Sequence, residues 1–208
     1  MKTKATAVAG LLGSLLLGAS IGVQAQTIDP AVQAVLESSF RSQGIADKSR
    51  MIPDEVQILC SDQAFFNSPE GQKKAIALQE AALKAIKPPS DGKYLGDWKA
   101  GEKVAQSGRG LTWSDGLDSP NGGSCYNCHQ VTKEEISYGT IGPSLLGYGK
   151  LRGNSQEIIE YTWNRINNSK AYNLCSNMPR FAHFNILTEQ QIKDVMALLL
   201  DPNSPVNQ

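Results

Sequence analysis

The 208-residue sequence predicts an all-α fold, and two observations support this prediction. Several segments of strong helix formers begin at residues that typically cap helices, and the last of them carries apolar side chains at helical spacing. No segment alternates apolar and polar residues as a half-buried strand does. Long glycine-rich loops join the segments, and loops of that length in a compact domain usually surround a ligand or carry function.

The N-terminal residues predict export. Lys2 and Lys4 precede an apolar run, and a small residue, Ala25, stands where a signal peptidase would cleave. We expect residues 1–25 to be a signal peptide removed in the periplasm. A membrane anchor is the alternative, although the run is near the short end for crossing a bilayer. The remaining chain holds 18 basic and 20 acidic residues, which is not the positive footprint that nucleic-acid binding requires.

The first clear helix is expected to begin at Ser68 and Pro69, a capping serine followed by a proline at the first helical position. Strong helix formers continue it until Pro88 and its neighbour end it. Residues 26–67 show no regular pattern. Residues 90–97 are rich in turn formers and indicate a linker.

Three more helices are expected further along the chain. One covers residues 98–106, and another covers residues 155–167 with Ser155 as its cap. The last begins with a capping box formed by Thr188 and Gln191 and ends before Pro202. Its apolar face consists of Ile192, Val195, Met196 and Leu199.

A cysteine motif follows the glycine-rich loop that comes after the expected helix at residues 98–106. Cys125-Tyr126-Asn127-Cys128-His129 has the C-x-x-C-H spacing of c-type haem attachment. Each thiol adds to one vinyl group of the porphyrin, and two intervening residues separate the sulfurs by the width of a porphyrin edge. We therefore expect one covalently bound haem c, attached through Cys125 and Cys128, with His129 as the proximal iron ligand.

Two other uses of the motif are less well supported. A redox dithiol would be expected in a βαβ context, which the sequence lacks. A structural zinc site needs four ligands, and the remaining cysteines, Cys60 and Cys175, are single and far apart.

The second axial ligand of an electron-transfer haem is usually a histidine or a methionine. Met178 is the favoured candidate, because it lies in a loop before the last helix and Pro179 fixes the backbone directly after it. Met196 is expected in the core and Met51 in the N-terminal extension. The alternatives are His183 or a vacant position, and a vacant position would indicate a gas sensor or a peroxidase.

The two cysteines outside the motif are expected to form a disulfide. Export would place Cys60 and Cys175 in an oxidising compartment, where spare thiols tend to pair. The bond would hold the N-terminal extension beside the Met178 loop. Two buried free thiols are the alternative.

Three side chains are candidates to contact the haem propionates. They are Trp163, Arg165 and Arg180. The alternative for the tryptophan is core packing, and for the arginines it is solvated surface.

The order of these features resembles that of class I cytochromes c across residues 94–201. The resemblance implies that residues 94–208 form an all-α cytochrome c domain preceded by an extension, residues 26–93. It also implies that the carbonyl of Pro143 accepts a hydrogen bond from His129 and orients that ligand.

The expected contact between the first and last helices departs from that family. Its first helix often offers an aromatic side chain to the last helix, whereas this chain offers Gly101, Val104 and Ala105. The two helices are expected to approach closely without the aromatic contact.

A more specific resemblance involves the C-terminal third of the chain. Residues 175–207, including MPRF at 178–181, are similar to the SoxX family of monohaem cytochromes, as are residues 139–153 and 160–173. Ala182 stands where the family motif has glycine. This is a small change unless the position requires a positive φ.

The resemblance to SoxX implies a function in periplasmic thiosulfate oxidation. SoxX and SoxA form SoxAX, an L-cysteine S-thiosulfotransferase that couples thiosulfate to a cysteine of the SoxYZ carrier. The chemistry is attributed to SoxA, so this chain would accept electrons and pass them to a small soluble cytochrome c. By itself it would be inactive, with no catalytic residue.

Two other functions are considered. The first is a free-standing electron carrier for a terminal oxidase, and residues 26–93 count against it because a carrier needs only the haem domain. The second is a haem sensor or peroxidase, and the Met178 loop counts against that.

Overall fold

The computed structural model describes residues 28–208. The expected signal peptide, residues 1–25, lies outside the described residues. The described chain is helical, as the sequence predicts, and apart from an isolated bridge between Gln43 and Ala46 it contains no β-structure. None of the helices in this part of the chain is long and apolar enough to cross a bilayer.

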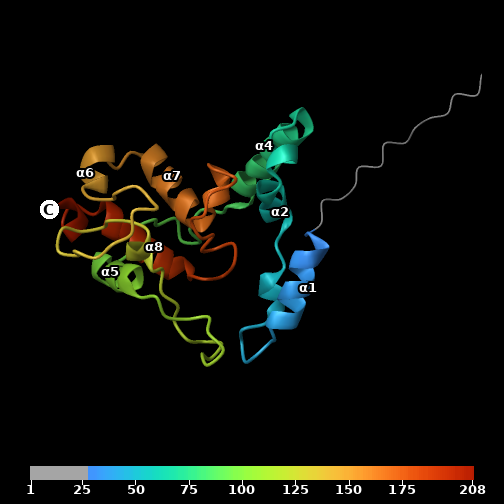
Figure 1. Ribbon diagram of the computed structural model, residues 1–208. Helices are drawn as coiled ribbons and strands as arrows, with labels where there is room; N and C mark the ends of the chain where they lie inside the picture. The colour runs from blue at the N-terminus through green and yellow to red at the C-terminus, as the bar shows by residue number, and fades with distance from the viewer. Residues whose placement is uncertain (1–27) are drawn as a thin grey trace, which may run out of the picture.

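The helices fall into two groups (Figure 1). The α-helices are α1 (Pro30–Ser39), α2 (Glu55–Ser61), α3 (Gln63–Phe66), α4 (Pro69–Ala85), α5 (Trp98–Gln106), α6 (Tyr148–Arg152), α7 (Gln156–Asn167) and α8 (Glu189–Leu200). Short 3-10 helices are η1 (Lys48–Met51), η2 (Cys125–Asn127), η3 (Ser169–Ala171) and η4 (Pro205–Asn207). Helices α5 to α8 gather into one body, and α1, α2 and α4 lie along one side of it.

The four helices expected from the sequence are present. Helix α4 begins after Ser68, whose hydroxyl accepts a hydrogen bond from the N–H of Gly71. It ends at Ala85, slightly earlier than the two prolines require. Helix α8 has its capping box, in which Thr188 and Gln191 satisfy each other's backbone N–H groups.

The expectation that residues 26–67 are irregular was wrong, and one other short helix was not predicted. Residues 26–67 contain α1, η1, α2 and α3, each preceded by a capping aspartate such as Asp54. These short helices bury few side chains, and α1 buries none, so no apolar periodicity revealed them. Helix α6 begins after Gly147, within the glycine-rich segment that follows the cysteine motif. Because glycine disfavours helices, the sequence did not predict this one.

Helices α5 and α8 form the most extensive contact between elements, and small residues make it close. A Cβ atom at Gly101 would lie 2.0 Å from the carbonyl oxygen of Asp194. The backbone N–H of Asp97 donates to the carboxylate of Asp194 at 2.9 Å, which fixes the start of α5 against α8. The expected close approach of the two helices is therefore confirmed.

The linker is in contact with the helical body along its length. Asp91 forms an ion pair with Lys193 at 2.8 Å, and the Tyr94 ring meets Trp163 edge-on at 5.5 Å between ring centres. The indole N–H of Trp163 donates to the carbonyl of Lys87 at 2.9 Å. These contacts tie α4 to α7 and α8.

Candidate haem-binding site

The two thiols and the imidazole are brought together by a tight turn. Ser124 has a left-handed backbone (φ 51°), which turns the chain into η2. The N–H groups of Cys128 and His129 then donate to the carbonyl of Cys125 at 3.1 and 2.9 Å. Glycines let the preceding loop return close to α5, since the N–H of Gly123 donates to the carbonyl of Val104 at 2.8 Å.

A second loop holds the imidazole in one orientation. Nδ1 of His129 lies 2.7 Å from the carbonyl oxygen of Pro143. Because a carbonyl can only accept, Nδ1 must carry the proton, and Nε2 keeps its lone pair for a metal. Gly142 makes room for the ring, since a Cβ there would lie 2.2 Å from Cε1 of His129.

These groups line a cavity of about 830 Å³ between the helices of the main body. Its volume lies within the ordinary range of cofactor and ligand sites. Most of its wall is apolar, contributed by Val131, Leu145, Ile166, Phe181, Leu187, Val195, Leu198 and Leu199. An apolar wall of this kind excludes water from whatever the cavity holds.

Met178 lines the same cavity, together with the two thiols and the imidazole. Its backbone is held at both polar groups, because its N–H donates to the hydroxyl of Ser176 at 3.1 Å and its carbonyl accepts from Ser169 at 2.6 Å. Pro179 follows and restricts the backbone further. The loop thus presents the thioether to the cavity from a fixed backbone.

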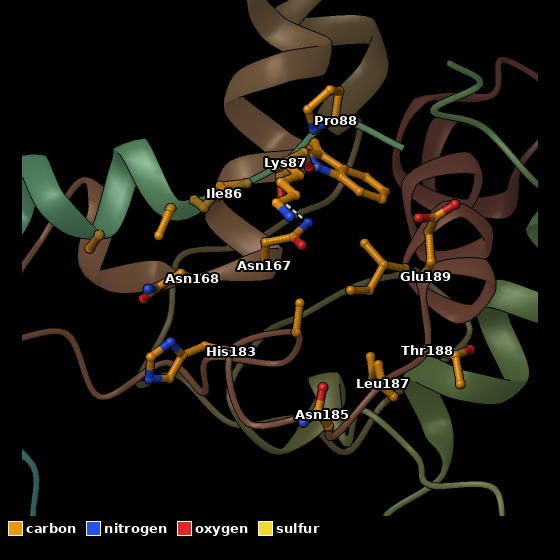
Figure 2. Close-up of a pocket in the computed structure, with 15 residues that line it drawn as sticks. Ile86, Lys87, Pro88, Asn167, Asn168, His183, Asn185, Leu187, Thr188 and Glu189 are labelled. Atoms are coloured by element: carbon orange, nitrogen blue, oxygen red, sulfur yellow. Dashed lines mark hydrogen bonds between the residues drawn. The ribbon is translucent and has the colours of Figure 1, made fainter. Parts of the chain in front are cut away.

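The other ligand candidates lie elsewhere. Met196 is fully buried within the core cluster and does not line the cavity. Met51 is 38% exposed in η1. His183 lines a separate, smaller cavity of about 430 Å³. Figure 2 shows this second cavity, with the His183 imidazole at its rim and directed away from Ile86, Lys87 and Pro88.

The thiol chemistry is unlike that of a redox dithiol. Burial raises the pKa of the Cys125 thiol to about 11, and the neighbouring Cys128 adds to the increase. A cysteine that reacts as a thiolate needs a lowered pKa. Among residues 28–208, no group of three or more His, Cys, Asp or Glu side chains is arranged to hold a metal ion.

The structure contains a disulfide between Cys60 and Cys175, whose Cα atoms lie 5.5 Å apart. Cys175 also lines the main cavity, so the bond joins α2 to its edge. Beside it, Leu174 packs in a small core with Leu59 and Ala75 of the extension. The extension is thereby fixed next to the Met178 loop.

The three propionate candidates have different positions. Trp163 is buried in the core cluster and does not line the main cavity, whereas Arg165 does. The alternative prediction of a solvated surface position was wrong for Arg180. Its side chain is 6% exposed, forms an ion pair with Asp54 of the extension at 2.5 Å, and lies over the Phe184 ring.

Asp54 was not among the residues predicted for the site. Its position as the cap of α2, three residues before Gln57, was readable from the sequence, but its partner Arg180 is far away along the chain. Ala182 needs no positive φ, so its difference from glycine is accommodated.

The residues fit a covalently held haem. Two thiols at C-x-x-C spacing, the His129 imidazole and the Met178 thioether belong to residues that line one apolar cavity. Nε2 of His129 is free to bind a metal, because Nδ1 donates to the carbonyl of Pro143. The cradle at Gly142 leaves His129 the space that a Cβ would take.

Two comparisons with known proteins find similarities, and the first of them covers this site. A family model described as cytochrome c matches residues 120–201, from just before the haem motif to the end of α8. A protein of Aquifex aeolicus (strain VF5), described as an uncharacterized lipoprotein, is 37% identical over 164 residues, which are 77% of this chain and 75% of that protein. The first match includes both thiols, the imidazole and Met178.

Proposed function

We propose a specific role from the premise that residues 120–201 form a cytochrome c domain, which indicates an electron-transfer haem protein. The role is that of the electron-accepting subunit of a periplasmic thiosulfate-oxidising SoxAX enzyme. The observation that carries the electron-transfer function is that Cys125, Cys128, His129 and Met178 all line the same apolar cavity. The export of the chain is supported by its leader pattern and by the description of its relative as a lipoprotein.

The chain's residues prepare the site for one-electron exchange. A bound haem c supplies an iron that cycles between two oxidation states. Cys125 and Cys128 would hold the porphyrin through thioethers, and the Pro143 carbonyl keeps His129 in the tautomer that could bind the iron. Met178 would supply a thioether to the iron and would favour the reduced state more than a second histidine would, which suits a subunit that receives electrons.

The proposed overall reaction releases two electrons. The carrier thiol and thiosulfate combine into a cysteine S-thiosulfonate with loss of one proton: R–SH + S₂O₃²⁻ → R–S–S–SO₃⁻ + H⁺ + 2 e⁻. We assign the sulfur chemistry to the SoxA partner, with the carrier cysteine on SoxYZ. This chain takes the electrons one at a time and passes each to a small soluble cytochrome c.

Two features support a subunit over a free-standing carrier. The first is the similarity of residues 175–207 to SoxX. The second is the extension, which is bonded to the Met178 loop and which an independent carrier does not need. The cysteines also favour the assignment of catalysis to the partner, because Cys60 and Cys175 are paired in a disulfide and Cys125 and Cys128 would be occupied by the haem.

Reconstitution tests the proposal. The purified holoprotein is expected to be reduced and reoxidised but not to couple thiosulfate to SoxYZ, and addition of a cognate SoxA should produce coupling. The Met178→His variant should bind SoxA normally and slow electron exit, while Met196→Leu should behave as the wild type. Coupling by this chain alone, or failure to bind any cognate SoxA, would contradict the subunit role. The second result would favour a carrier cytochrome.

A further inference from the structure

The extension touches the Met178 loop on both sides of the methionine. Three residues before Met178, Cys175 is bonded to Cys60 of α2. Two residues after it, Arg180 forms an ion pair with Asp54, the residue that caps α2. The same short helix therefore holds the loop at two points.

Arg180 depends on this carboxylate. Its side chain is 6% exposed, and a buried charge without a partner is costly. The neighbouring groups do not help, because Lys170 and His183 are both basic. The pKa of each is lowered, first by burial and second by the charge of Arg180. Asp54 is acidic and faces this basic cluster, since its charge acts on both Lys170 and His183.

Asp54 is itself fixed. One carboxylate oxygen accepts a hydrogen bond from the N–H of Gln57 at 2.9 Å, and the other pairs with Arg180. Helix α2 is anchored in turn by Leu59, which is fully buried, and by the disulfide at Cys60. A rigid chain of contacts runs from α2 through Asp54 to the backbone that carries Met178.

We propose that Asp54 is a positioning residue for the axial ligand: its carboxylate holds Arg180 in place and so keeps Met178 directed into the haem cavity. The inference rests on the assignment of Met178 as the ligand. It goes beyond that assignment, because it gives the N-terminal extension a part in the properties of the iron site. Loss of the carboxylate leaves Arg180 to seek solvent, and the loop two residues away moves with it.

The test separates a positioning role from a general effect on stability. Asp54→Asn removes the charge but keeps a good helix cap. The control is Asp91→Asn, which breaks the ion pair with Lys193, another pair between the N-terminal half and the helical body but away from the Met178 loop. Both are measured as ferric holoprotein titrated with imidazole, which competes with the methionine for iron.

The expected result is a rise of about tenfold or more in apparent imidazole affinity for Asp54→Asn and less than about twofold for Asp91→Asn. Arg180→Lys is a second variant in case the first is not recovered, and it should also raise the affinity. Because both act through one ion pair, the double variant should rise no further than Asp54→Asn alone.

Two failures can be distinguished. If Met178→Ala leaves the spectrum and the imidazole affinity unchanged, the methionine is not the ligand and both proposals fall. If Met178→Ala changes both while Asp54→Asn matches the wild type, or matches Asp91→Asn, the positioning role alone is overturned.

Discussion

At the scale of single residues, Met178 and Met196 have identical side chains in different surroundings. Met178 lines the haem cavity from a loop, and Met196 is fully buried in the α8 face of the core. Met178→His should keep a six-coordinate, low-spin spectrum and lower the reduction potential, because imidazole donates more strongly than a thioether. Optical spectra and redox titration measure both properties.

The matched control is Met196→Leu, a swap of similar volume that should cost less than about 1.5 kcal/mol and leave the haem spectrum unchanged. A spectrum that responds at position 196 and not at position 178 would reverse the assignment.

The Asp54–Arg180 pair should also give a characteristic dependence on pH. Burial raises the pKa of Asp54, but the hydrogen bond from Gln57 and the guanidinium of Arg180 outweigh it, so the pKa lies below its ordinary value of 3.8. A carboxyl whose pKa is lowered on folding stabilises fully above its unfolded pKa and loses that effect as the pH falls through the folded pKa. The difference in unfolding free energy between wild type and Asp54→Asn should therefore be constant above about pH 5 and shrink below 3.8.

Urea unfolding at a series of pH values measures this difference. A gap that persists unchanged to the lowest pH, or one that has already vanished at about pH 5, would count against the pair.

The residues of the site differ in how far the sequence could reveal them. Cys125, Cys128 and His129 are adjacent, so their spacing alone carries the chemistry. Asp54 and Arg180 are brought together by the fold, and no local pattern connects them. An arginine is usually exposed, which is why its burial was not anticipated.

At the scale of elements, the contact between α5 and α8 depends on a glycine. A Cβ at Gly101 would meet the carbonyl oxygen of Asp194 at 2.0 Å, and backbone cannot move aside as a flexible side chain does. Gly101→Ala should lower the free energy of unfolding by about 1–3 kcal/mol, despite the better helix propensity of alanine. Gly116→Ala is the control, because a Cβ there makes ordinary contact at 3.5 Å.

Thermal or urea unfolding of both variants checks the prediction. Equal stability of the two variants would mean that the helices can separate without cost.

The elements that sequence patterns predicted well are those with both a cap and a buried face. Helix α8 has the Thr188 capping box and an apolar stripe, and its bounds follow from them. Helix α1 has a capping Asp29 followed by proline but buries no side chain, so the cap was the one signal available. Helices this short are marginally stable by themselves, so tertiary contacts rather than helix propensity determine whether they form.

At the scale of the whole molecule, the extension is fastened to the haem domain through covalent, ionic and apolar contacts. The disulfide joins Cys60 to Cys175 across 115 residues, and Arg180 and Leu174 add the other contacts. For a loop of this length a disulfide stabilises by about 4–5 kcal/mol in the chain-entropy account, and less where a covalent cofactor already restrains the unfolded chain. The extension is thus built to stay in place beside the axial ligand.

Each of the four cysteines of the chain has an assigned role, Cys60 and Cys175 in the disulfide and Cys125 and Cys128 in the proposed haem thioethers. This makes the intact mass of the denatured, alkylated and unreduced protein the most direct test of these roles. The expected mass is that of the exported chain plus one haem with no alkyl group, and reduction before alkylation should add two. A mass without haem and with two alkyl groups would show Cys125 and Cys128 as free thiols, and the haem site would be refuted.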